Sequence, residues 1–185
     1  MSSGISDHLR ACEGFTRIAE QAGGRWDRPS PCTDWEARGV VEHVIGFHDV
    51  LILRPLDAKP KRPGEDPAAR WSLTVAALSL ALRRTHEGLS PPDTDMPDVD
   101  LRHLLPMLTT DVLVHTWDLA QAIGCDAALD PALSEAAYVR ARQNEERLRA
   151  SGMFAPSVRV SEDEDIETKL VAFLGRDPGW NASLG

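Results

Sequence analysis

The chain has 185 residues, of which 42% are hydrophobic and 26% charged, a composition typical of globular proteins, and its formal net charge is −9. Such an acidic chain, without a basic stripe, would be repelled by a phosphate backbone, so we expect no nucleic-acid partner. No apolar run approaches the roughly 20 residues of a membrane span, and the N-terminus lacks the order of a signal peptide, which predicts a cytoplasmic protein without membrane contacts.

The first predicted helix covers residues 5 to about 22, because apolar residues recur there at helical spacing and Gly23 and Gly24 then supply a stop. A loop with two prolines follows. Thr33 and Glu36 have the spacing of a capping box, which predicts the start of the second helix. Its expected inward face consists of Val40, Val44, Phe47, Val50 and Leu51.

The second helix should end near residue 53, because Pro55 cannot donate into a continuing helix. The next stretch holds three prolines and mixed charges, which indicates an exposed connection. A third helix is expected over residues 68–87 with Gly88 as its end. Its inward residues should be Trp71, Val75, Leu78 and Leu82.

A fourth helix is expected from about Leu104 to Gly124, with Pro106 tolerable only in its first turn. Asp130 and Pro131 form an N-cap and N1 pair for a fifth helix that should reach about residue 150.

Ser161 and Glu164 have capping-box spacing before a short sixth helix that should end at Gly175. The segment 156–160 alternates weakly and is the one place where a strand is conceivable.

Ala, Leu, Arg and Glu dominate the chain, and only 5% of its residues are aromatic, which favours helix over sheet. Helices of this length with modest connections predict an all-α protein, an antiparallel four-helix bundle with one or two extra short helices. At this length a single domain over residues 1–185 is the expectation.

One face of the fourth helix carries the most informative chemistry. Positions 104, 108, 111, 115, 118, 119 and 122 share it, so Asp111, His115 and Asp118 lie among leucines and an alanine. Burying these groups is costly unless something compensates, and Asp111 and His115, four apart, can both bind one ion. On the second helix, His43 lies on the inward stripe. We therefore identify His43, Asp111 and His115 as a candidate divalent-metal site.

An alternative stays open on spacing alone: both histidines could be core residues satisfied by a carboxylate or a backbone carbonyl, with no metal. Imidazole and carboxylate suit zinc, nickel, iron or manganese. His48 points away from His43 toward solvent or a neighbouring element, and His8, His86 and His103 are expected to be structural.

The three cysteines are too few and too far apart for a disulfide framework or a metal knuckle. Cys12 is expected to be a small core residue, whereas Cys32 lies in a loop and stays open as a reactive thiol.

The segments PCTDWEARGVVEHVIGF (31–47), DVLVHTWDLAQAIG (111–124) and FLGRDP (173–178) resemble the DinB-like helical bundle superfamily. More narrowly, they resemble its branch named after mycothiol-dependent maleylpyruvate isomerase. In that family, one His comes from the second helix and an acidic or His residue plus a His, four apart, come from a later helix. The resemblance thus implies metal ligands at His43, Asp111 and His115.

The resemblance also implies an enzyme that uses a low-molecular-weight thiol, mycothiol, as cosubstrate in an isomerisation or thiol transfer. Zinc is the first candidate for the metal, and Asp118 is a candidate catalytic base or a carboxylate that orients His115. The expected partners are a small-molecule substrate, the thiol and a second copy of the chain in a homodimer. The alternatives are a metal-dependent hydrolase and a non-catalytic metal- or ligand-binding bundle.

Overall fold

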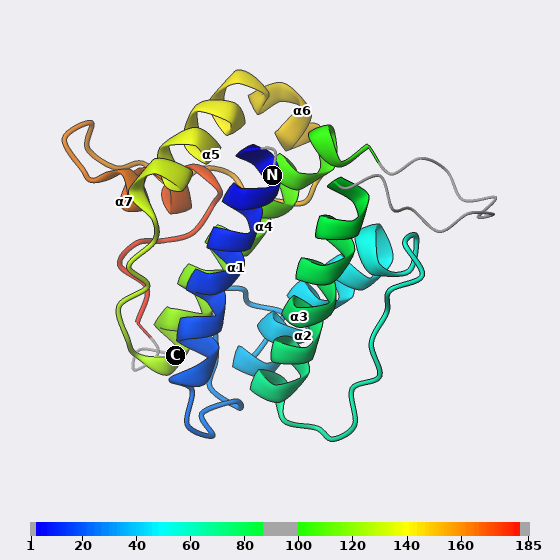
Figure 1. Cartoon of the computed structure of the whole chain (residues 1–185). Helices are drawn as coiled ribbons and strands as arrows, with labels where there is room; N and C mark the ends of the chain where they lie inside the picture. The colour runs from blue at the N-terminus through cyan, green and yellow to red at the C-terminus, as the bar shows by residue number, and fades with distance from the viewer. Residues whose placement is uncertain (1–2, 87–99, 182–185) are drawn as a thin grey trace.

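A computed structural model describes residues 3–86 and 100–181, and within these ranges the chain is all-helical (Figure 1). These ranges contain seven α-helices and one π-helical segment, and none of the helices described there is both long and apolar enough to cross a membrane. In chain order the elements are α1 (Ser3–Glu20), α2 (Ala37–His48), η1 (Asp49–Leu53), α3 (Pro67–His86), α4 (Leu101–Ile123), α5 (Pro131–Gln143), α6 (Glu145–Ala150) and α7 (Ile166–Phe173). The expected all-α bundle is confirmed.

The four long helices form a ring in which α1 packs on α3 and α4, and α2 packs on the same two helices. The colours of Figure 1 show that α2 and α3 point in one direction and α1 and α4 in the other. The bundle therefore has parallel as well as antiparallel neighbours. This is possible because the connection over residues 54–66 runs back along the bundle between η1 and α3.

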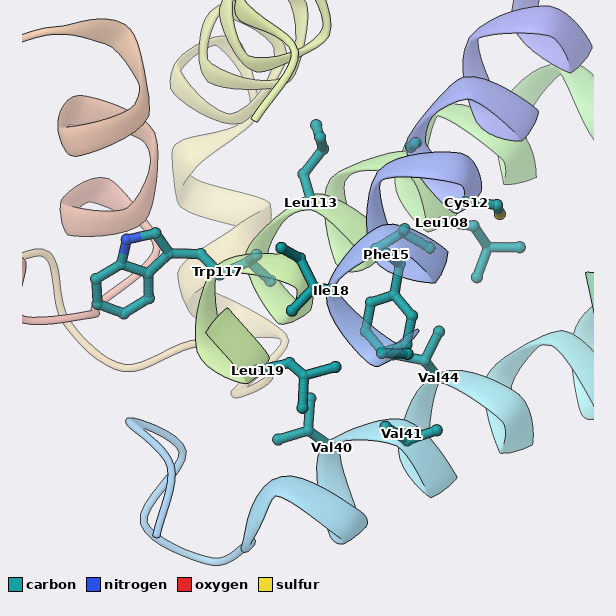
Figure 2. Packing of buried hydrophobic residues seen from close by; sticks show 14 of the residues in the cluster. Cys12, Phe15, Ile18, Val40, Val41, Val44, Leu108, Leu113, Trp117 and Leu119 are labelled. Carbon is teal, nitrogen blue, oxygen red and sulfur yellow. The ribbon is translucent and has the colours of Figure 1, made fainter. Parts of the chain in front are cut away.

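The core lies between these helices and is built from apolar residues at helical spacing (Figure 2). Helix α4 is its centre: every residue from 111 to 120 is buried, because α5 and α7 cover the side that faces away from the bundle. The sequence predicted one buried face for α4, but in this stretch the helix is buried on all of its faces. Because this part of α4 is shielded from solvent, its polar side chains need hydrogen-bond or ionic partners within the protein.

The second helix differs from its prediction at both ends. It starts at Ala37, and its N-cap Glu36 makes no side-chain cap, so the expected capping box with Thr33 does not form. At its far end the helix widens into η1, where the Arg54 amide bonds to the Asp49 carbonyl, five residues back. Val50, which the sequence placed on the inward face, is 56% exposed.

Further along the chain, several helix boundaries also differ from expectation. Helix α4 starts three residues earlier than predicted, which places Pro106 in its second turn. The predicted fifth helix breaks at Asn144 into α5 and α6, although its Asp130 N-cap is confirmed by bonds from two backbone amides. Helix α7 takes Asp165 as N-cap, not Ser161. The segment 156–160 is not a strand, and Gly88 lies outside the described residues.

Candidate metal centre

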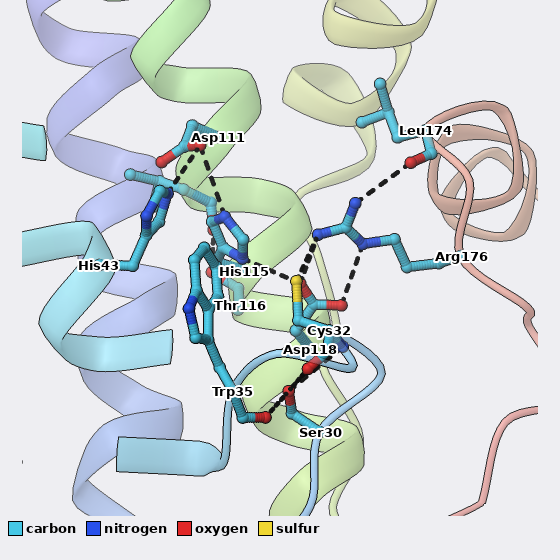
Figure 3. A network of polar contacts seen from close by, with 11 residues as sticks. Ser30, Cys32, Trp35, His43, Asp111, His115, Thr116, Asp118, Leu174 and Arg176 are labelled. Carbon is cyan, nitrogen blue, oxygen red and sulfur yellow. Dashed lines mark hydrogen bonds and ion pairs between the residues drawn. The ribbon is translucent and has the colours of Figure 1, made fainter. Parts of the chain in front are cut away.

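Three polar side chains meet where α2 faces α4, and they are His43, Asp111 and His115 (Figure 3). Asp111 Oδ1 lies 3.5 Å from His43 Nε2 and 3.5 Å from His115 Nε2. Asp111 and His115 are buried, whereas the His43 side chain is 18% exposed. The structure therefore brings together the three residues that the sequence singles out as metal ligands.

The arrangement of these donor atoms fits a small divalent ion. Ligand atoms about 2.0 to 2.2 Å from a tetrahedral ion lie about 3.3 to 3.6 Å from one another, which matches both distances around Asp111 Oδ1. The other oxygen, Asp111 Oδ2, is buried and has no hydrogen-bond partner among the described residues. An unpartnered carboxylate oxygen in a core is costly, and a bound cation would compensate it.

The charges of the site depend on two carboxylates that flank His115. Burial by itself lowers the pKa of His115, but hydrogen bonding to Asp111 and Asp118 outweighs burial and raises this pKa to about 9. Burial likewise raises the pKa of Asp111, yet the bonds from His115 and His43 leave it below its usual range. Without metal, His115 is therefore an imidazolium at neutral pH that donates from both ring nitrogens.

Asp118 lies behind His115 and not among the residues that line the adjacent cavity. Its Oδ2 accepts from His115 Nδ1 at 2.9 Å and from Arg176 Nη2 at 2.8 Å, and its Oδ1 accepts from Arg176 Nε at 3.2 Å. Asp118 is fully buried, so Arg176 is its counter-ion. These contacts fit a carboxylate that orients His115, because a ligating histidine commonly donates its other N–H to a carboxylate.

Arg176 reaches this position from the chain that follows α7 (Figure 3). Gly175 precedes it with φ of 85°, and a Cβ there would lie 2.6 Å from the Ala155 carbonyl oxygen. Only glycine fits this close, left-handed turn, which aims Arg176 back into the bundle.

An aromatic wall holds His43 from the other side. The His43 ring stacks on Trp35 with centroids 4.3 Å apart and contacts Phe47 at 4.5 Å. Trp35 can lie this close to α2 because Gly39 has no side chain: a Cβ there would lie 2.9 Å from the Trp35 Cβ. The stacked Trp35 ring and the tilted Phe47 ring together restrict the ring of His43, whose Nε2 lies toward Asp111.

A cavity of about 340 Å³ opens onto the three donor residues. Besides them, its lining includes Trp35, Phe47, Phe154, Arg176 and Cys32. Burial and the charge of Asp118 raise the pKa of the Cys32 thiol to about 11. Cys32 is thus protonated at neutral pH, which disfavours the reactive thiolate that its loop position left open.

The remaining histidines and Cys12 can be compared with their sequence-based interpretation. His48 is fully buried, where it contacts His8 of α1, so the neighbouring element and not solvent is its environment. His8 is equally buried, and Cys12 is a core residue as expected. Arg176 was missed as part of the site because it lies 58 positions beyond Asp118 and outside any helical pattern.

Comparison with known proteins supports the family resemblance. Residues 8–120, more than half of the chain, match the family model of the mycothiol maleylpyruvate isomerase N-terminal domain. Two uncharacterized proteins of Mycobacterium tuberculosis, from strains CDC 1551 / Oshkosh and ATCC 25618 / H37Rv, are each 30% identical over 91% of this chain and 95% of their own length. No solved structure matches the chain significantly.

Proposed function

Because the chain belongs to the family of the mycothiol maleylpyruvate isomerase N-terminal domain, we propose that it is a metal-dependent enzyme that uses a low-molecular-weight thiol. His43, Asp111 and His115 hold one divalent ion, with zinc as the first candidate and nickel, iron or manganese as the others. The single observation that carries the proposal is the buried, unpartnered Asp111 Oδ2 beside two imidazole nitrogens and an open cavity.

Three protein donors at the edge of a cavity would leave a bound ion open to an exogenous ligand, as in catalytic sites. An ion held by these residues would lower the pKa of a coordinating thiol and so supply a nucleophile at neutral pH. Within the chain, Asp118 keeps the tautomer and orientation of His115, and Arg176 neutralises Asp118. Trp35 and Phe47 exclude water from one face of His43 and offer an apolar surface to a substrate.

The proposed reaction is either an isomerisation through reversible thiol addition to a double bond or a transfer of the thiol to an electrophile. Both reactions need a thiol and an electrophilic small molecule to meet at one position. The cavity, about 340 Å³ in volume and lined by aromatic residues next to the donor atoms, is of a size that holds small ligands. Mycothiol is the proposed thiol because the family is named for it.

Thermal unfolding in the presence of thiols tests this proposal. We expect mycothiol to raise the melting temperature of zinc-loaded protein, because a ligand at 100 times its Kd stabilises the folded state by about 2.7 kcal/mol. Glutathione, cysteine and a thiol-free mycothiol analogue are measured in parallel. The shift should vanish in His115→Ala. Identical melting curves with every thiol, on protein shown to hold one ion per chain, would contradict the thiol-dependent function and favour a hydrolase or a binding protein.

The affinity for zinc should increase with pH, because binding must displace the proton from His115 Nε2. Below a pKa of about 9 this proton competes with the metal, so zinc affinity should rise about tenfold per pH unit from pH 7.5 and level off above pH 9. Competition with a chromophoric chelator at several pH values measures it.

Asp118→Asn is the matched variant, since it removes one of the two carboxylates that raise the pKa of His115. The zinc affinity of this variant should level off at a lower pH than the zinc affinity of the wild type. A zinc affinity that does not change between pH 7.5 and 9 would show that no proton leaves His115 on binding.

A further inference from the structure

A second cluster of metal-ligating side chains lies in the core, away from the cavity. It joins His8 and Cys12 of α1 to His48 at the end of α2. The three donor atoms, His8 Nε2, His48 Nε2 and Cys12 Sγ, lie within 4.8 Å of one another. All three residues are fully buried, and Figure 2 shows Cys12 among the apolar core side chains. The centre proposed above does not use any of them.

Hydrogen bonds on the far side of each imidazole aim the Nε2 atoms at one another. His48 Nδ1 lies 2.6 Å from the Val44 carbonyl oxygen, which can only accept, so Nδ1 carries the proton. The Thr109 hydroxyl donates to the Leu105 carbonyl at 2.7 Å and forms a hydrogen bond with His8 Nδ1 at 3.2 Å. Burial lowers the pKa of both histidines, so both rings are neutral.

His48 Nε2 is an acceptor, so in the metal-free protein His8 Nε2 donates to it at 3.0 Å. Transfer of that proton to His8 Nδ1, next to the Thr109 hydroxyl, frees both Nε2 lone pairs for one ion. Cys12 Sγ, 3.8 Å from His8 Nε2, adds a soft third donor on the same side. Backbone and hydroxyl partners on the far nitrogen of each histidine are the usual surroundings of metal ligands.

We propose that His8, Cys12 and His48 form a second metal site that binds one Cu(I) ion. Two imidazoles and a thiolate in a three-coordinate arrangement suit copper, and soft sulfur selects its monovalent form. Loading is a simple exchange: the Cys12 thiol releases one proton to solvent, a copper–sulfur bond forms, and copper stays monovalent throughout.

The charge of the ion favours Cu(I) over zinc at this position. One thiolate and one monovalent ion make a neutral unit, which the core accepts, whereas Zn²⁺ would leave an uncompensated charge. The carboxylates whose charges reach these histidines, Asp111 and Asp49, have partners of their own: Asp111 faces His43 and His115, and Asp49 pairs with Arg62. A divalent ion would also require a fourth ligand in this fully buried position.

Copper content and coordination test the site on the whole protein. The chain is produced in copper-supplemented medium, purified without a tag in the absence of oxygen, and analysed for copper and zinc. We expect one copper per chain, and X-ray absorption should show one sulfur and two nitrogen neighbours. Cu(I) titration of metal-free protein against a chromophoric Cu(I) chelator measures affinity.

The variants distinguish this site from the centre at His43. Cys12→Ser should weaken Cu(I) binding by at least about 100-fold, since it removes the thiolate itself, while Cys125→Ser should leave binding unchanged. His43→Ala should keep its copper. Copper without a sulfur neighbour in wild-type protein, equal affinity in Cys12→Ser, loss of copper in His43→Ala, or zinc in place of copper at these residues would each overturn the proposal. The X-ray absorption result stands even if a variant fails to fold.

Discussion

Zinc retention should be lost in His115→Ala and in His43→Ala, from about one ion per chain to a trace. Each change removes one of three donors and leaves Asp111 with a single imidazole partner. Removing an outer hydrogen-bond partner of a metal ligand already costs about 10- to 100-fold in affinity, so loss of a ligand should cost more than about 100-fold. Elemental analysis of protein reconstituted with zinc and then desalted measures the change.

His103→Ala is the matched control for this experiment. His103 is on α4, as His115 is, but its side chain is 88% exposed and its ion-pair partner is Asp100, at the start of the helix. It should retain zinc at the wild-type level. Zinc retention in folded His43→Ala and His115→Ala equal to that of His103→Ala would show that the three residues do not hold the ion.

The second large effect is expected for stability, in Arg176→Ala. Removing this guanidinium leaves Asp118 buried and charged with His115 as its remaining partner. Breaking a buried ion pair on one side destabilises a protein by about 3 to 5 kcal/mol, because a charge stays behind in a low-dielectric site. Urea unfolding of the metal-free variant at pH 7, compared with wild type, measures the loss.

Two further variants serve as controls for the Arg176→Ala experiment. Arg102→Ala changes an arginine whose side chain is 93% exposed and should leave the unfolding midpoint unchanged. The double variant Arg176→Ala/Asp118→Ala removes the stranded charge as well, so it should be more stable than Arg176→Ala alone. A double variant that is less stable than the single one would show that the carboxylate is well solvated or paired elsewhere.

Much of the candidate site follows from local sequence spacing. Asp111 and His115 are four apart on one helix, so their proximity is a property of the α-helix itself. His43 joins them because the apolar stripe of α2 shows which of its faces turns inward. The contact with Arg176 could not be predicted in this way, since a turn at Gly175, not a periodic pattern, aims that side chain.

The prediction for Val50 is wrong for another reason: the predicted inward face of the second helix is too wide. Ten steps of about 100° carry Val50 about 80° away from Val40, and the structure exposes it while Asp49 and Ile52 are inside. The capping boxes failed for a different reason. The N-cap of α7 is Asp165 and not Ser161, because the Asp165 side chain is the one that accepts a hydrogen bond from a free backbone amide in the first turn of the helix.

The pairing of α1 with α4 has a consequence for how the chain acquires its structure. During synthesis α1 emerges first, yet residues 21–100 must be made before the first turn of α4 appears. Until then α1, whose Phe15 and Ile18 are fully buried in the finished protein, can pack on α3 through the contact of Phe15 with Trp71 but lacks α4. Because α2 and α3 are parallel, they cannot form a simple hairpin that folds ahead of the rest. We therefore expect productive folding to start only after most of the chain has left the ribosome, with the first helix exposed to chaperones in the interval.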